Sequence, residues 1–373
     1  MGPSVHEVAH IINNVKSQLP EIVSNTWKQR TLYALSRCRT AAMGGHIDRC
    51  DHPSCSRLHI SYNSCRNRHC PKCQSHLREQ WIAKREADLI NMPYFHVVFT
   101  LPEYLNQLAL EKPRLIYGLL FASAWGVIRD FGANPKMLGA RMGMIAVLHT
   151  WGQNLSLHPH LHCIVPAGGL TPQGKWKTTK SKGRFLFSVK AMGRVFRARF
   201  VEGLRKQTAL PQSLANKLFE KPWVVYAKRP FFGPRQVIEY LGRYTHKIAI
   251  SNSRIMDVSG DRVIFRAKDY RQGAKRIVLR LDTQEFIRRF SLHILPKGYT
   301  RIRHFGILNG RVKALYKQIA DQQLGRIGII PTSKPILHRK CPACKKGVLQ
   351  IIFYFDQRGP PDRRLLKLLS AKK

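Results

Sequence analysis

Acidic residues are scarce in this chain. Its 373 residues include 21 Asp and Glu against 64 Lys and Arg, and the formal net charge is +43. So large a positive charge indicates that the protein binds a polyanion. The basic residues run through the whole chain, whereas a membrane-surface protein more often concentrates them in one amphipathic helix or a tail. The composition therefore indicates nucleic acid as the partner.

Long apolar runs are also missing. The longest, at 115–128, has 14 residues and is bracketed by Arg114 and Arg129. A membrane span needs about 20 apolar residues, so this run predicts a buried helix, and we expect no membrane partner. The N-terminal residues lack the basic start and apolar stretch of a signal peptide. We therefore expect the protein to stay in the cytoplasm.

Cysteines, by contrast, are frequent. In a reducing cytoplasm the nine of them favour metal binding over disulfides. Cys50 and Cys55 form one close pair, and Cys70 and Cys73 form a second pair 14 residues later. Each pair can span one edge of a tetrahedron from a tight turn, which suits zinc. We expect these four thiols to hold a structural Zn²⁺.

Other residues leave the zinc ligand set open. The spare ligands near the two pairs are Cys38, Cys65 and His69. They allow a different fourth ligand or a second zinc. Near the C-terminus Cys341 and Cys344 form another pair, with His338 before them and no further ligand downstream. This pair could belong to a second, small zinc knuckle near the C-terminus.

Histidines occupy alternate positions in the segment "LHPHLHCIVP" at 157–166. The β-branched runs at 144–151 and 160–168 predict an antiparallel hairpin. On a strand His160 and His162 share one face, and the hairpin brings His149 opposite them. Three imidazoles on one face predict a catalytic metal site with positions left for a phosphate oxygen. Gln153 is the alternative third ligand, and His158 is expected to be structural or to face DNA.

Two tyrosines supply a nucleophile for phosphodiester chemistry. Tyr240 and Tyr244 lie four residues apart in a segment, 235–250, that predicts a helix, so they share one helical face. Attack by tyrosine on DNA gives a phosphotyrosine ester, which conserves the bond energy for later joining. The residues that we expect to bind DNA are Arg243, Lys247 and, among the cysteines, Arg66 and Arg68.

The remaining pattern mixes helices with antiparallel strands. Apolar periodicity predicts helical structure over 4–35, a polar helix is expected at about 77–90, and the apolar run lies within a helix expected over 113–130. The further segments that predict regular structure are a strand at 94–102, a basic helix at 189–206, a strand in "WVVYAKRP", a hairpin within 262–281, and a helix that Asp282 caps.

Several of these segments carry a family resemblance. "HPHLHCIVPAGG", preceded by "LHTWGQNL" and followed by "YLGRYTHKIAISNSRI", resembles the rolling-circle transposases of the HUH superfamily, of the two-tyrosine type found in the insertion-sequence-91 family. "SYNSCRNRHCPKCQ" resembles the N-terminal zinc-binding domain of that family, and residues 265–308 resemble its C-terminal part. The similarity extends over roughly residues 10 to 345. The first cysteine pair departs from the family's usual closer spacing.

The resemblance implies an α+β fold. Its core would be a ferredoxin-like or RRM-like antiparallel HUH nuclease sheet with helical insertions. His160 and His162 would lie on a central strand, and Tyr240 and Tyr244 on a helix beneath. The implied domains are N-terminal helices with a zinc-binding domain at 1–92, the nuclease domain at 93–310, and a basic C-terminal tail with a zinc knuckle at 311–373.

The resemblance also implies an activity and its partners. With Mg²⁺ or Mn²⁺ at the histidines, the protein would cut single-stranded DNA at element ends, leave a 5′-phosphotyrosine and a free 3′-OH, and transfer the strand to target DNA at the bacterial nucleoid. No P-loop motif occurs, so a host helicase or replication machinery would separate the strands. A plasmid replication initiator or relaxase uses the same chemistry. A non-catalytic zinc-finger protein would explain the charge and cysteines but not the histidines and tyrosines.

Overall fold

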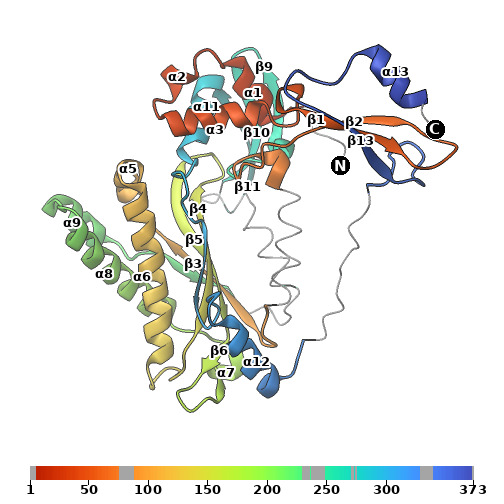
Figure 1. The fold of residues 1–373 in the computed structure, drawn as a ribbon. Coiled ribbons are helices and arrows are strands. Elements are labelled where there is room, and N and C mark those ends of the chain that lie inside the picture. Colours follow the sequence, from red (N-terminus) through yellow and green to blue (C-terminus); the bar gives the residue numbers. More distant parts are fainter. Residues whose placement is uncertain are drawn as a thin grey trace.

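A five-stranded antiparallel sheet lies at the centre of the computed structural model (Figure 1). In order across the sheet, its strands are β12 (Ile302–Gly306), β4 (Gly143–Trp151), β5 (Leu157–Pro166), β3 (Tyr94–Thr100) and β8 (Val225–Ala227). Each strand is antiparallel to its neighbours. The predicted hairpin is therefore confirmed, and its second strand, which carries the histidines, occupies the middle of the sheet. The structure describes residues 6–74, 88–228, 248–269, 275–327 and 339–371, with single positions 236 and 273.

Helices cover one face of this sheet (Figure 1). They are α5 (Asn106–Glu111), α6 (Pro113–Ala133), α8 (Val189–Gln207) and α9 (Gln212–Glu220). Pro113 starts α6, where its fixed φ suits the first helical turn. Although α6 is long and apolar enough to cross a membrane, two-thirds of that stretch is buried inside the protein. The apolar run thus forms the predicted buried helix.

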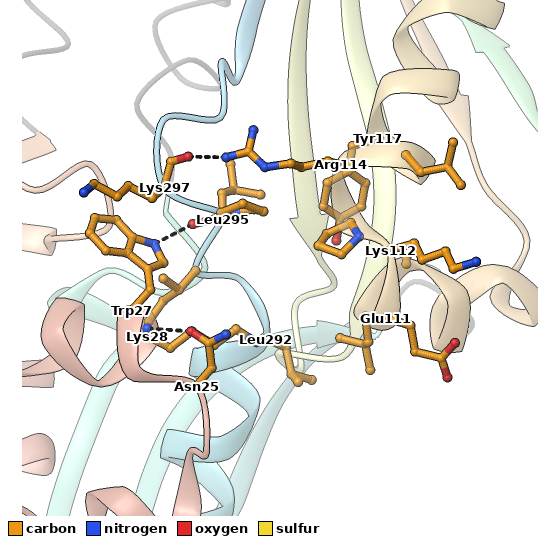
Figure 2. Close-up of a pocket in the computed structure, with 16 residues that line it drawn as sticks. Asn25, Trp27, Lys28, Glu111, Lys112, Arg114, Tyr117, Leu292, Leu295 and Lys297 are labelled. Carbon is orange, nitrogen blue, oxygen red and sulfur yellow. Dashed lines mark hydrogen bonds between the residues drawn. The ribbon is translucent and has the colours of Figure 1, made fainter. Parts of the chain in front are cut away.

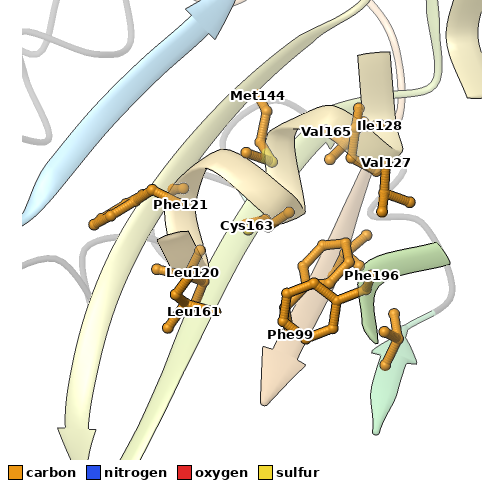
Figure 3. Packing of buried hydrophobic residues seen from close by; sticks show 14 of the residues in the cluster. Phe99, Leu120, Phe121, Val127, Ile128, Met144, Leu161, Cys163, Val165 and Phe196 are labelled. Carbon is orange, nitrogen blue, oxygen red and sulfur yellow. The ribbon is translucent and has the colours of Figure 1, made fainter. Parts of the chain in front are cut away.

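The main hydrophobic core lies between α6 and the sheet (Figure 3). Alternate residues of β5 point into it, Leu161, Cys163 and Val165, and all three are fully buried. Leu120 and Phe121 of α6 and Phe196 of α8 belong to the same cluster. Since strand side chains alternate between faces, the residues between these three on β5 lie on the opposite face of the sheet.

A second core joins the N-terminal helices to a smaller sheet. The elements are α1 (Val8–Asn14), α2 (Leu19–Ile22), α3 (Thr26–Ser36), β9 (Ile255–Ser259), β10 (Arg262–Asp269), β11 (Lys275–Asp282) and α11 (Thr283–Leu292). The periodicity over 4–35 is thus divided among three helices. Pro20 lies at the start of α2, and the Asn25 side chain accepts a hydrogen bond from the Lys28 amide at 3.1 Å to cap α3.

A third sheet unites the two ends of the chain. Strand β13 (Leu349–Phe355) pairs antiparallel with β1 (Gly45–Cys50), and β1 pairs with β2 (Leu58–Tyr62). From the sequence, no strand was predicted within 38–76 or after residue 311. Strands β1 and β13 pair residues about 300 positions apart, and such pairing leaves little local signal.

The other predicted elements fall in two groups. The strand at 94–102, the basic helix, the hairpin β10–β11 and the helix after Asp282 are confirmed. The helices expected at 77–90 and 235–250 lie outside the described residues, apart from the ends of each range. Minor elements complete the fold: β6 (Gly168–Leu170), β7 (Trp176–Thr178), α7 (Lys180–Gly183), α12 (Lys313–Leu324) and α13 (Arg363–Ala371). The predicted α+β class with antiparallel sheets is correct, and the ferredoxin-like connectivity stays a prediction.

Candidate active site and metal centres

Three histidines converge on the sheet face opposite α6. His160 and His162 alternate along β5 with the core residues Leu161 and Cys163, so they project away from the helices. His149 on β4 is the direct cross-strand partner of His160. The hairpin therefore brings together the three imidazoles that the sequence grouped. Gln153 lies in the turn after β4, and His158 lies at the exposed entry of β5.

The spacing of these imidazoles suits one shared ion. The nearest ring nitrogens of the three residues lie within 4.8 Å of one another. His160 Nε2 and His162 Nε2 are 3.2 Å apart, and two nitrogens bound at about 2.1 Å to one ion lie about 3.0–3.4 Å apart. His149 and His162 are buried, with 2% and 9% of their surfaces exposed. The group can therefore act as a metal site partly shielded from solvent.

Hydrogen bonds orient two of the three rings. His160 Nδ1 lies 2.6 Å from the His158 backbone carbonyl, which can only accept, so Nδ1 carries the proton and Nε2 keeps its lone pair. His162 Nδ1 lies 2.8 Å from His96 Nε2. Burial, and secondarily the charge of Lys228, lowers the pKa of His96 to about 4. A neutral His96 can accept at Nε2. Metal binding at His162 Nε2 requires that nitrogen to be unprotonated, so with the ion bound His162 Nδ1 would donate to His96 Nε2.

Sequence reasoning gave His96 no role. It lies on β3, diagonal to His162 across the strand pair. In the sequence it is a single histidine within an apolar strand. Its contact with His162 can be inferred only when the register between β3 and β5 is known.

The cysteines form two groups of four, and each group has its thiols within 4.8 Å of one another. The first contains Cys38, Cys65, Cys70 and Cys73, and the second contains Cys50, Cys55, Cys341 and Cys344. The structure thus corrects the expected set, because the two pairs that we had placed around one ion belong to different groups. The spacing along the chain was misleading, since each pair has a nearer partner elsewhere in the fold.

The first group fits tetrahedral zinc. The Sγ atoms of Cys38 and Cys73 are 3.7 Å apart, and those of Cys65 and Cys73 are 3.8 Å apart. With Zn–S bonds of about 2.3 Å, the edges of a tetrahedron are about 3.8 Å long. The Cys65 amide also donates to Cys38 Sγ at 3.4 Å, a contact that stabilises a bound thiolate.

Comparison with known proteins supports the zinc-binding domain and places the chain in a family. Residues 10–101 match the family model of a transposase zinc-binding domain of the insertion-sequence-91 type, and residues 143–315, which include all three histidines, match a putative transposase. A "Putative transposase y4qJ" of Sinorhizobium fredii (strain NBRC 101917 / NGR234) is 43% identical over 370 residues, covering 90% of this chain and 92% of that protein. The "Transposase for insertion sequence element IS801" of Pseudomonas savastanoi pv. phaseolicola is 31% identical over 303 residues, covering 77% and 71%.

The chain belongs to the insertion-sequence-91 family of transposases. It carries the zinc-binding domain of that family at its N-terminal side, and it is an enzyme that cleaves and joins DNA. No solved structure gives a significant match to the chain.

The zinc-binding domain of the transposase contacts the segment before β12. The Arg68 guanidinium donates to the backbone carbonyls of Tyr299 and Pro296, the latter at 3.1 Å. The Leu295 amide donates to His69 Nε2 at 3.4 Å. Arg68 is half-buried, burial lowers its pKa, and its two contacts join two segments of the chain; its role in DNA binding stays a prediction.

The other predicted DNA-binding residues of the transposase have different positions. Arg66 is exposed, with φ of +51°, and remains available to a ligand. Arg243 and Lys247 lie outside the described residues, as do the two predicted nucleophiles, Tyr240 and Tyr244.

A basic pocket of about 540 Å³ lies where α3, α6 and the segment after α11 meet (Figure 2). Trp27 and Tyr117 flank it from two sides. Its charged lining residues are Lys28, Lys112, Arg114, Lys297 and a single acid, Glu111. Cations beside aromatic rings are the groups that commonly bind the phosphates and bases of single-stranded nucleic acid.

Loss of the first cysteine group should destabilise the transposase. We expect Cys73→Ser to release one zinc and to lower the free energy of unfolding by about 4 kcal/mol or more, since loss of a structural metal is among the largest single-residue effects. Metal analysis and thermal denaturation measure both. Cys163→Ala is the control, because Cys163 is buried in the main core and belongs to neither cysteine group. Normal zinc content in Cys73→Ser would contradict the assignment.

Removing the acceptor behind His162 should weaken metal binding. We expect His96→Leu to lower Mn²⁺ affinity at the histidine site about 10- to 100-fold, the usual effect of losing such a partner. His96→Gln keeps a side-chain acceptor and should retain more of the affinity. Calorimetric titration with Mn²⁺ measures the difference, and zinc content shows whether each variant is folded. Equal affinities in wild type and His96→Leu would show that His96 does not orient His162.

Proposed function

We propose that this transposase cuts one strand of single-stranded DNA at the ends of its element with a tyrosine nucleophile, assisted by a metal ion at His149, His160 and His162. The observation that carries the proposal is the convergence of the three imidazoles on one face of the central hairpin. A packed core does not explain three adjoining histidines, two of which have rings oriented by hydrogen bonds at Nδ1.

The donor set limits which ion can bind. Within the part of the chain that the structure describes, no carboxylate belongs to the histidine group. Imidazole nitrogen favours a first-row transition ion over Mg²⁺, so of the two expected ions we propose Mn²⁺ as the better fit. When bound, the ion polarises the scissile phosphate. The residues of the chain hold it in place, and His96 and the His158 carbonyl fix the rings.

The covalent step uses Tyr240 or Tyr244. The phenolic oxygen attacks the phosphorus, a Tyr O–P bond forms, and the bond from phosphorus to the 3′ oxygen breaks. The proton leaves the tyrosine and the departing oxygen becomes a free 3′-OH, while the 5′ end stays attached as phosphotyrosine. Attack by a 3′-OH of another strand reverses these bonds and joins the DNA. With two tyrosines the cleavage and joining steps can occur twice, as rolling-circle transposition requires.

The charge of the chain supports binding to the substrate. A net charge of +43 provides sequence-independent affinity for phosphates. We propose that the basic pocket beside Trp27 and the exposed Arg66 contact the strand, with Arg243 and Lys247 near the nucleophiles. The absence of a P-loop motif from the sequence leaves strand separation to a host helicase, and we place the reaction in the cytoplasm, at the nucleoid.

A covalent-adduct assay tests the function. Purified transposase is incubated with labelled single strands from each end of its element, with Mn²⁺, Mg²⁺ or EDTA. We expect a denaturant-resistant, protease-sensitive adduct on the 5′ side of the cut, a free 3′-OH on the other side, and no product in EDTA. DNA binding should persist in EDTA and fall steeply with salt. Cleavage in EDTA, or products without any protein–DNA adduct, would reject the proposal.

A further inference from the structure

The second cysteine group joins residues from opposite ends of the chain. Cys50 Sγ lies 3.6 Å from Cys344 Sγ, and Cys55 Sγ lies 3.8 Å from Cys341 Sγ. The family model of the zinc-binding domain ends at residue 101, so it includes the first cysteine of each contact and not the second. The C-terminal pair, which had no fourth ligand downstream in the sequence, finds its missing ligands in the N-terminal domain.

The distances fit a metal and not disulfides. The sulfur atoms of a disulfide are about 2.05 Å apart, whereas the two contacts here match the edge of about 3.8 Å in a tetrahedral zinc–thiolate site. We propose that Cys50, Cys55, Cys341 and Cys344 hold a second structural zinc ion, which fastens the C-terminal segment to the zinc-binding domain.

Both turns that carry the thiols have the same backbone design. The Ser56 amide donates to the His52 carbonyl at 3.2 Å, and the Lys345 amide donates to the Cys341 carbonyl at 2.9 Å. Ser56 and Lys345, each directly after a cysteine, have φ of +44° and +60°, a conformation that costs non-glycine residues energy. Two matching strained turns that present four thiols to one point indicate a ligand at that point.

Gly347 leaves room for the cluster. A Cβ atom at this position would lie 2.4 Å from Cys50 Sγ and 2.7 Å from His52 Cβ. The Gly347 amide also donates to Cys344 Sγ at 3.3 Å, which stabilises a thiolate ligand. Gly347 is therefore a position where the cluster can be disturbed without removing any sulfur.

The surrounding sheet of β13, β1 and β2 has little hydrophobic core to stabilise it. It has three short strands, and large apolar residues remain on its surface: Ile351 is 48% exposed and Tyr354 is 71% exposed. A sheet this small has little core of its own. Polar contacts help, since Arg339 donates to the buried Asp48 carboxylate at 2.9 Å and Asp51 accepts from the Val348 amide at 2.7 Å. A zinc ion would supply the larger share of the stability.

Zinc stoichiometry of the full-length protein tests the site. By native mass spectrometry we expect two zinc ions per wild-type chain, two in Cys163→Ala, and one in the double variant Cys341→Ser/Cys344→Ser. The double variant Cys70→Ser/Cys73→Ser should also keep one ion, held by the second group. Gly347→Val, which retains every cysteine, should release zinc to a chelator at least tenfold faster than wild type.

The same measurement can overturn the proposal. One zinc in the wild type, or equal zinc counts in the wild type and in Cys341→Ser/Cys344→Ser, would rule out a site at these thiols. A wild-type mass lower by two hydrogens for each cysteine pair, with no zinc at the pair, would show disulfides instead. If Cys341→Ser/Cys344→Ser misfolds, Co²⁺ substitution of the wild type decides: absorption bands typical of tetrahedral thiolate coordination should correspond to two ions per chain, and bands for one ion contradict the second site.

Discussion

His162→Ala is expected to abolish metal-dependent cleavage. His162 lies at the centre of the histidine group. Its Nε2 is 3.2 Å from Nε2 of His160, and its Nδ1 is 2.8 Å from Nε2 of His96. An ion that stabilises the charge on a phosphoryl oxygen contributes several kcal/mol to the transition state, and about 1.4 kcal/mol corresponds to a tenfold rate. The single-turnover cleavage rate should therefore fall by about 10³ or more.

DNA binding should survive the same substitution. Most affinity for DNA comes from Lys and Arg contacts with phosphates, and His162 is buried, with 9% of its surface exposed. Fluorescence anisotropy should therefore give a dissociation constant within about threefold of wild type. His158→Ala is the matched control, because the hydrogen bond that orients His160 is accepted by the backbone carbonyl of His158, which the substitution keeps; it should cleave at nearly the wild-type rate. Normal cleavage by His162→Ala would reject the metal site.

The third ligand can be decided in the same assay. His149 lies with the other two histidines, and its ring centroid is 4.5 Å from that of His162. His149→Ala should therefore lose cleavage as His162→Ala does. Gln153→Ala should keep it, because Gln153 lies in the turn beyond the end of β4. The opposite pattern would assign Gln153 as the ligand.

Features that depend on local sequence were predictable. The β-branched runs on each side of a short turn gave the hairpin, and strand periodicity put His160 and His162 on one face. The apolar run between two arginines gave α6. In each case the residues that determine the structure lie within about twenty positions of one another, so propensity and periodicity carry the information.

Features that depend on pairing between distant parts of the chain were not predictable from the sequence. The division of the cysteines into two groups requires the knowledge that β13 pairs with β1, and the role of His96 requires the register between β3 and β5. Arg68 is similar: its position among the zinc ligands does not reveal its contacts with the backbone carbonyls of Pro296 and Tyr299. Which partner a side chain meets across hundreds of residues is fixed by packing, and packing leaves no local pattern.

The contacts of Arg68 and His69 link the zinc-binding domain to the central sheet. Arg68 and His69 hold the segment 295–299, which leads into β12, and β12 pairs with β4, the strand that carries His149. Loss of zinc from the first cysteine group would therefore release a contact only a few residues from an edge strand of the central sheet. The zinc-binding domain and the central sheet are thus physically connected within one chain.

The two tyrosines provide the other large expected effect. Tyr240→Phe and Tyr244→Phe remove the nucleophilic hydroxyl but keep the ring, so the free energy of unfolding should change by about 1 kcal/mol or less. The double variant should form no covalent adduct, because no other phenol replaces the attacking oxygen. Denaturing gel analysis of labelled strands measures the adduct, and the variant should still bind DNA and hold its zinc.

The single variants distinguish one nucleophile from two. If both tyrosines on the predicted helical face serve the same metal site in turn, one holds the 5′ end while the other attacks next. Each single variant should then retain first-strand cleavage or fail only at the second step, so that adduct forms in the cleavage assay while transposition of a marked element in cells is lost. If Tyr240→Phe instead removes every adduct and Tyr244→Phe transposes at the wild-type frequency, Tyr244 is a packing residue. That result would refute the two-tyrosine mechanism but not the histidine–metal chemistry, because a single tyrosine can still attack a phosphate that His149, His160 and His162 position through their ion.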